Sequence, residues 1–442
     1  MKKLTDGNIY KNFLYFGIPI ALSGLLSQCY GIINSAIAGR FLGAEGLAAT
    51  GATSSLISFL SSIFWGYGTG FSIYAARLFG AGKNKDVKNV VYSNLRIIFL
   101  VSLAIAICVI IFCNHILDWL NVDPEIKADS AAYLCIYMCG FCIITVNTSS
   151  VFVMQALGAS SFPFWMSLIS GILTVSGNVV SVVVLELGVK GIAMSTVLAV
   201  LIVRICYIFK MKKCFRQLGV ADSKVEFGFG LFKNSFSYGG ASMLQQMIMY
   251  AASVMVSPTI NALGAAATAG YSVANQINTT NAQLYQSASK CVSNYIAQAI
   301  GVGKGENIKK GVKVGFIQGI MFLTPLLLIC VFFARGVNGI FFSESGDKEA
   351  FDIAMIFSKV YLPFLYINVI NNLFHALFRG IGASALLGLS TAIGAVSRVL
   401  LSIILPCKMG MHGIYLAWVL SWVIEAVFST YIYFSGKWKK AL

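Results

Sequence analysis

Ionisable side chains are scarce inside the long apolar stretches of this sequence, and those few are the first candidates for chemistry. Glu425, Lys290 and Arg398 lie deep within such stretches. A charged group in an apolar environment is costly, so each needs a partner or access to water. Two interpretations remain open: the charges form ion pairs that fix helix packing, or Glu425 binds and releases a proton in a cavity.

His375 and Asn371 lie together in another apolar stretch, over 352–379, and are two further candidates. A histidine can act as a proton relay, although a lone buried histidine is also commonly a hydrogen-bonded packing residue. Amide and tyrosine side chains are frequent nearby, and we expect them to line a cavity suited to organic molecules of modest polarity. Cross-linking of neighbouring helices is the alternative role for such amides. The predicted lining residues are Gln245, Gln246, Tyr271, Asn275 and Gln286.

The sequence shows no pattern of residues that is typical of an enzyme active site. The chain has three histidines and eleven cysteines, and the cysteines fall mostly in apolar stretches without histidine partners. Such cysteines pack as small hydrophobic residues, so the sequence predicts no metal site. The segments Gly80–Lys83 and Gly301–Lys304 contain glycines and a lysine but lack the spacing of a phosphate-binding loop. We therefore expect no enzyme and no bound cofactor.

The elements that position these residues are membrane-spanning helices. Hydrophobic residues make up 58% of the chain, charged residues 11%, and the mean hydropathy is +0.80. Alternating ten-residue segments typical of membrane barrels are absent, which favours an all-α integral membrane protein. Twelve spans are predicted, with approximate boundaries 13–37, 52–77, 93–113, 129–157, 163–185, 189–211, 235–260, 269–299, 313–340, 352–379, 384–406 and 411–434.

The sequence also repeats itself. Leu42–Ala44 recurs as Leu263–Ala265, and Gly80–Lys83 recurs as Gly301–Lys304, both 221 residues later. Each half holds an even number of spans, so the halves have parallel topology and a pseudo-two-fold axis along the membrane normal. We expect an N-lobe over residues 1–211, a cytoplasmic linker over 212–234 and a C-lobe over 235–442, each lobe with six helices.

The net charge of +16 comes from lysines and arginines whose positions indicate the membrane topology. Lysines and arginines concentrate in the loops on one side of the predicted spans, as the positive-inside rule requires of cytoplasmic loops. The charge therefore predicts cytoplasmic N- and C-termini and a lipid bilayer as the partner, rather than a nucleic acid. We expect a monomer in the plasma membrane.

Several motifs together resemble one family over essentially the whole chain. The motifs are Gly39–Gly43 with Gly46–Ala49, Gly68–Gly70, Ala76–Lys83, Phe378–Gly382 and His412–Ala417. They resemble segments of multidrug and toxic compound extrusion (MATE) transporters. The resemblance implies two six-helix lobes, alternating access, and export of organic compounds driven by inward movement of H⁺ or Na⁺.

Two departures from that family pattern concern the N-lobe. The resemblance implies an aspartate where this chain has Asn34, and a second one where it has Val182. Asn178 and Thr196 match the remaining oxygen ligands of the implied cation site. Since hard cations bind weakly without carboxylates, we expect an atypical coupling site. Two alternatives remain open: the coupling acid is Glu425 in the C-lobe, or the protein uses another driving force. Lys290 and Arg398 favour a neutral, zwitterionic or anionic substrate.

Two other functions remain compatible with the sequence. One is a flippase for lipid-linked precursors of the same superfamily, which often carries additional helices. The other is a membrane scaffold that has lost transport, for which the missing N-lobe carboxylates are the best support. The repeat and the polar faces of the spans favour the exporter.

Overall fold

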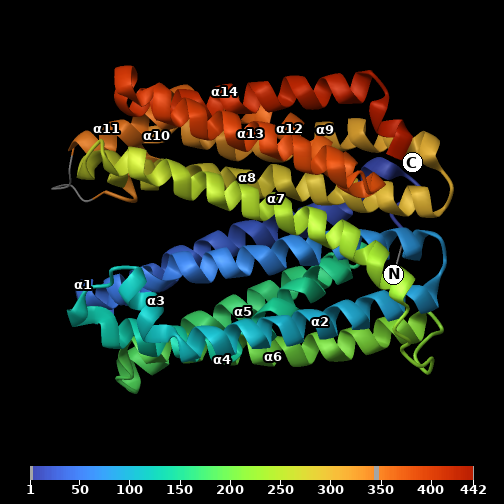
Figure 1. Ribbon diagram of the computed structural model, residues 1–442, viewed down its shortest axis with the longest axis horizontal. Coiled ribbons are helices and arrows are strands. Elements are labelled where there is room, and N and C mark those ends of the chain that lie inside the picture. The colour runs from blue at the N-terminus through green and yellow to red at the C-terminus, as the bar shows by residue number, and fades with distance from the viewer. Residues whose placement is uncertain (1–2, 343–347, 442) are drawn as a thin grey trace. The chain divides into compact units, whose positions relative to one another are not determined.

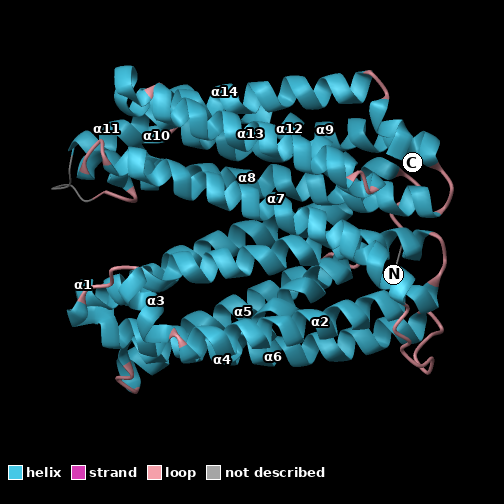
Figure 2. Cartoon of the chain, viewed as in Figure 1, coloured by secondary structure: helices cyan, strands magenta, loops and turns pink. Residues whose placement is uncertain are grey.

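The computed structural model describes residues 3–342 and 348–441, except for the side chains of Ala44, Leu47 and Ala441. These residues form helices joined by short loops and contain no strand (Figure 2). The α-helices are α1 (Ile9–Gly80), α2 (Asn84–Ile111), α3 (Cys113–Trp119), α4 (Pro124–Ala156), α5 (Ser161–Val179), α6 (Gly188–Gln217), α7 (Phe229–Asn261), α8 (Ala265–Gly301), α9 (Ile308–Phe332), α10 (Ala334–Gly339), α11 (Lys348–Ile356), α12 (Leu365–Ile381), α13 (Ser384–Ile404) and α14 (Pro406–Phe434). The shorter helical segments are Val180–Val184, Gly305–Asn307, Phe357–Tyr361, Leu362–Phe364 and Lys437–Ala441.

Ten helical segments of the described chain are long and apolar enough to cross a membrane. The helix α1 supplies two of them, Ile9–Gly43 and Ala48–Gly80, because its backbone breaks at Gly43. The helices α7 and α8 have 33 and 37 residues, but amide and hydroxyl side chains make them less apolar than the others. With these two, the described residues form twelve long helical segments at the predicted positions, and the all-α prediction is confirmed for this part of the chain.

The span predicted over 352–379 is an interrupted helix. It consists of α11, a π-helical segment at Phe357–Tyr361, a 3₁₀ segment at Leu362–Phe364, and α12. Pro363 lies in the 3₁₀ segment, where its missing N–H would leave a gap in a regular helix. The interruption separates α12, which carries Asn371 and His375, from the preceding helix.

The second repeated motif ends a helix in both copies. Gly82 and Gly303 have φ angles of 72° and 80°, a left-handed conformation that glycine adopts without strain. The Lys83 N–H donates to the Leu78 carbonyl at 3.1 Å, and the Lys304 N–H donates to the Ala299 carbonyl at 2.8 Å. These bonds satisfy carbonyls at the helix ends, so both glycines act as C-caps.

The chain forms two compact units whose boundary falls inside two helices, α1 and α7. The first unit contains Leu25–Met243 with Lys3, and the second contains Leu4–Gly24 with the residues from Leu244 onward. The start of α1 thus belongs with the second half of the sequence, and the start of α7 with the first. The sequence predicted an N-lobe over 1–211, a linker over 212–234 and a C-lobe over 235–442. The two units differ from that division in the assignment of these two helix starts.

Close backbone approach holds the first half of α7 within the first unit. A Cβ atom at Gly70 would lie only 2.1 Å from the Tyr238 carbonyl oxygen. The Tyr67 hydroxyl donates to Asn94 at 2.6 Å, and Asn94 donates to Ser235 at 3.0 Å, so α1, α2 and α7 are linked. In the same unit α4 packs against α2 and α6, and α5 packs against α6 (Figure 1).

Polar contacts hold the start of α1, up to Gly24, within the second unit. The Leu4 N–H donates to Gln298 Oε1 at 2.7 Å, and Gln318 Nε2 donates to the Phe13 carbonyl at 2.7 Å. A Cβ atom at Gly17 would overlap Gln318, so a small residue is required there. In this unit α8 packs against α9, α11 and α12, and α13 packs against α14.

Candidate functional site

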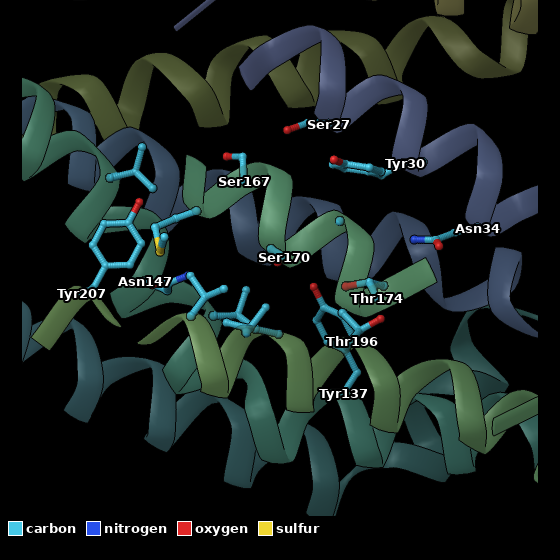
Figure 3. A pocket seen from close by; sticks show the side chains of 17 residues that line it. Ser27, Tyr30, Asn34, Tyr137, Asn147, Ser167, Ser170, Thr174, Thr196 and Tyr207 are labelled. Atoms are coloured by element: carbon cyan, nitrogen blue, oxygen red, sulfur yellow. The ribbon is translucent and has the colours of Figure 1, made fainter. Parts of the chain in front are cut away.

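The first unit contains a cavity of about 480 Å³ between α1, α4, α5 and α6 (Figure 3). Among the described residues, none of the side chains that line it is charged. The lining residues are Ser27, Tyr30, Gly31, Asn34, Tyr137, Ile144, Asn147, Val151, Met166, Ser167, Ser170, Gly171, Thr174, Thr196, Val200, Val203 and Tyr207. Hydroxyl, amide and aromatic groups on apolar walls suit an organic molecule of modest polarity.

One face of α5 forms the small, polar wall of this cavity. Ser167, Ser170, Gly171 and Thr174 follow the helical spacing of three and four residues, so their positions share a face. A Cβ atom at Gly171 would lie 1.8 Å from the Tyr30 ring, which shows how closely that ring approaches α5. Glycine at this position therefore allows Tyr30 of α1 to form the neighbouring wall.

The three predicted N-lobe residues lie in the lining of this cavity or next to it. Asn178 Nδ2 donates to Asn34 Oδ1 at 2.9 Å, and both Asn34 and Thr196 line the cavity. Val182 packs in a small apolar cluster with Ala38 and Ile192. Since only neutral oxygens are present here, a cation such as Na⁺ would be held weakly.

Two amide oxygens beside this cavity lack protein partners. The buried Oδ1 atoms of Asn147 and Asn178 accept no hydrogen bond from any residue that the structure describes. An unpaired buried acceptor costs about 1–3 kcal/mol. Asn147 lines the cavity, so a hydrogen-bond donor on a bound molecule would offset that cost.

The second unit contains a buried pair of ionisable side chains. His375 of α12 and Glu425 of α14 approach to 2.8 Å between Nε2 and Oε1, and their side chains are only 9% and 8% exposed. A Cβ atom at Gly394 of α13 would lie 2.6 Å from Glu425 Oε2, so glycine leaves the space that the carboxylate occupies. The three helices α12, α13 and α14 thus enclose a group that can bind a proton.

The partners of His375 determine where its proton resides. Arg379 Nη2 donates to Gln245 Oε1 at 2.6 Å, and Gln245 Nε2 lies 3.0 Å from His375 Nδ1. Arginine can only donate, so the amide oxygen must face Arg379 and the amide NH₂ must face the imidazole. Nδ1 is then an acceptor, and a neutral His375 carries its proton on Nε2.

Two serines extend this network. His375 Nε2 lies 3.3 Å from Ser390 Oγ, and Ser390 Oγ lies 2.7 Å from Ser429 Oγ. Both serines are fully buried. Hydroxyl groups can donate or accept, so they can adjust when Glu425 gains or loses a proton.

Asn371 and Arg398 occupy the same region with different partners. Asn371 Nδ2 donates to the Trp422 carbonyl at 3.0 Å, one turn before Glu425 on α14. The Arg398 guanidinium lies 4.8 Å from the Trp418 ring centroid in a cation–π contact. The Nε atom of Arg398 is buried without a hydrogen-bond partner among the described residues. Arg398 is therefore held by an aromatic ring, and the carboxylate of Glu425 pairs with His375.

The remaining candidates lie elsewhere in the second unit. Lys290 is half-buried on α8, within electrostatic range of Arg379. Tyr271 packs edge-on against Trp418, with ring centroids 5.5 Å apart. Gln246, Asn275 and Gln286 are half-buried. The predicted lining residues are not part of the 480 Å³ cavity, which belongs to the first unit.

The sequence interpretation omitted most residues of that cavity. Tyr30, Tyr137 and Tyr207 belong to three separate helices, so their spacing gave no signal. The polar face of α5 could have been found from the sequence. Its small and hydroxyl residues recur at helical spacing, and Asn178 follows four residues after Thr174.

Comparisons with known proteins agree on one family. The family model described as MatE matches residues 19–180 and 241–404, one segment in each sequence half. Two probable multidrug resistance proteins of Bacillus subtilis are similar. YoeA is 23% identical over 78% of this chain and 76% of its own length, and YpnP is 23% identical over 98% and 97%.

Solved structures share the fold at low sequence identity. One is an outward-facing multidrug resistance MATE family transporter of the MOP superfamily, with a TM-score of 0.91, 17% identity, and coverage of 100% of this chain and 99% of that one. Another is a MOP superfamily transporter from Pyrococcus furiosus, described as having a binding pocket of reverse polarity. Its TM-score is 0.90 at 18% identity, with the same coverage.

Proposed function

The chain belongs to the MATE family of multi-pass membrane transporters, and we propose that it exports organic compounds from the cell by alternating access, driven by inward proton movement. The cavity of the first unit carries the proposal. Its volume of about 480 Å³ falls within the range typical of small-molecule sites, and its walls combine aromatic rings with hydroxyl and amide groups. The names of the relatives support export of organic compounds over transfer of lipid-linked precursors or a scaffold role.

A proton is the better candidate for the coupling ion. The buried His375–Glu425 pair can gain and lose a proton, whereas Na⁺ prefers a cage of oxygen ligands. A nitrogen atom occupies the position closest to Glu425 Oε1. The oxygens around Asn34 and Asn178 are neutral and would hold Na⁺ only weakly, so this cluster does not favour Na⁺ coupling either.

The lining of the cavity also suggests the class of substrate. With no charged side chain among its described lining residues, the cavity does not offset the charge of an organic cation. The unpaired Asn147 amide oxygen would accept a hydrogen bond from an N–H or O–H group. A neutral or zwitterionic compound with aromatic surface and a donor group fits these features.

Everted membrane vesicles test the proposal directly. Vesicles with an acidic interior are supplied with a panel of fluorescent organic compounds, and accumulation is measured together with dye-reported proton flux. We expect wild-type vesicles to accumulate at least one neutral or zwitterionic compound and to release protons as they do so. Glu425→Gln should abolish both signals.

Glu306→Gln is the matched control, since Glu306 is an exposed acid outside the network. It should transport as the wild type does. Transport by Glu425→Gln that keeps its proton coupling would exclude Glu425 as the coupling group. Accumulation that follows a Na⁺ gradient but not a pH gradient would exclude proton coupling altogether.

A further inference from the structure

A second pocket in the first unit differs from the 480 Å³ cavity in having two positive charges. It has a volume of about 580 Å³ and lies between α2, α4 and α6. Its lining residues are Tyr92, Leu95, Arg96, Phe99, Leu100, Ile143, Val146 and Arg204. Tyr92 lies within electrostatic range of both guanidinium groups.

The two arginines lack anionic partners in the protein. Arg204 Nη1 donates to Ser150 Oγ at 2.7 Å, and Ser150 is fully buried, so the guanidinium is held in place. Over the described ranges, no carboxylate lies within ion-pair distance of Arg96 or Arg204. Each arginine has five N–H donors, and most of these remain available to a ligand.

The sequence places both arginines at one edge of the apolar belt. Arg96 directly precedes the uncharged run Ile97–Cys113, and Arg204 lies between the uncharged residues 191–203 and 205–209, towards the end of the predicted span 189–211. Beyond them, α2 and α6 continue into lysine-rich ends with Lys88 and Lys210. This depth is where lipid headgroups meet hydrocarbon.

The pocket walls match a lipid more closely than a soluble anion. Phe99 and Leu100 are 40% and 62% exposed on the outer side of α2, and Ile143 and Val146 of α4 complete the apolar wall. Acyl chains would cover this surface, whereas inorganic phosphate would leave it bare. Arginine pairs bind phosphate oxygens through paired N–H donors, and basic pockets between spanning helices bind acidic headgroups.

We propose that this pocket binds an anionic phospholipid, with Arg96 and Arg204 holding its phosphate and the apolar wall contacting its acyl chains. Tyr92 donates its hydroxyl to the same headgroup. A zwitterionic lipid carries an ammonium group beside its phosphate, so it binds more weakly beside two arginines. The site shares no residue with the 480 Å³ cavity or with the His375–Glu425 network.

Native mass spectrometry of the detergent-purified protein tests this assignment. The protein is titrated with phosphatidylglycerol or with phosphatidylethanolamine of the same acyl composition. We expect phosphatidylglycerol to be retained selectively, and Arg96→Gln/Arg204→Gln to lower its affinity roughly tenfold or more. The control Lys212→Gln/Lys213→Gln removes the same charge from exposed positions of α6 and should retain the lipid.

Arg96→Gln alone provides a milder variant, since Arg96 is exposed and its loss leaves the Arg204–Ser150 bond intact. It should lower the affinity for phosphatidylglycerol by a smaller factor than the double change. Equal retention of phosphatidylglycerol by the wild type and both arginine variants would overturn the proposal. Equal binding of phosphatidylethanolamine by the wild type, or displacement of phosphatidylglycerol by millimolar inorganic phosphate, would overturn it as well.

Discussion

His375 and Glu425 form a pair in which Nε2 and Oε1 are 2.8 Å apart and both side chains are almost fully enclosed. Fifty residues separate them in sequence, on α12 and α14. A carboxylate in such surroundings is costly unless it is paired or protonated, so its proton occupancy is coupled to its neighbours. The pair is therefore a physical candidate for the element that links proton binding to a conformational change.

The orientation of Gln245 leads to the first prediction, which concerns the division of roles within the pair. Because Nδ1 of His375 faces an amide NH₂, the proton taken up by the network should reside on Glu425. His375→Gln keeps a neutral N–H donor close to Glu425, so transport should be slower but remain proton-coupled. Proton flux in vesicles measures this. Complete uncoupling by His375→Gln, as in Glu425→Gln, would contradict it.

The second prediction reverses the role of Gln245. Gln245→Glu places a carboxylate beside Nδ1, and a carboxylate only accepts hydrogen bonds, so the imidazole should carry a proton on Nδ1. This changes the proton arrangement around Glu425, so the rate of proton-coupled transport in everted vesicles should fall several-fold.

The neighbouring Gln246→Glu, which changes a half-buried residue outside the network, is the control for this loss. Its transport should keep the wild-type rate. A wild-type rate of transport by Gln245→Glu would show that Gln245 does not set the proton position of His375.

A third prediction concerns the uncharged cluster of the first unit. Asn34→Asp introduces a carboxylate next to Asn178, whose Oδ1 lacks a partner among the described residues. Carboxylate and amide oxygens together are suitable ligands for a hard cation. Saturating Na⁺ should then raise the Tm by a few degrees, corresponding to about 1 kcal/mol or more of binding free energy.

Thermal unfolding in NaCl and in choline chloride at equal ionic strength measures the Na⁺ effect. The wild type should unfold at the same temperature in both salts. An Asn34→Asp variant that shows no difference between the salts would argue against a latent cation site at this position.

The fourth prediction concerns the start of α7. Gly70→Ala would place a methyl group against the Tyr238 backbone, which cannot move without displacing the helix. Overpacking of this kind costs about 1–3 kcal/mol, so the free energy of unfolding should fall by that amount. Gly51→Ala adds the same methyl group where no atom lies within 4 Å, and it should be neutral or slightly stabilising. Equal stability of the two variants would disprove the close packing.

Much of the architecture follows from sequence alone, because it depends on local physical requirements. Hydrocarbon demands long apolar helices with satisfied backbone groups, so composition and run length indicate the twelve spans. The repeated glycines mark Gly82 and Gly303 because a left-handed turn after a helix favours that residue locally. The shared four-residue spacing of Asn371, His375 and Arg379 likewise places them on one face of α12.

The contacts between distant segments required the tertiary structure. Sequence identified Glu425 and His375 separately, but only the packing of α12 against α14 brings them to 2.8 Å. The same holds for Tyr30 against Gly171 and for the boundary between the two units inside α1 and α7. Helical periodicity fixes which residues share a face but not which face a neighbour meets, because that choice depends on side-chain fit across the whole bundle. The chemical groups were therefore determined by sequence, and their pairing by the fold.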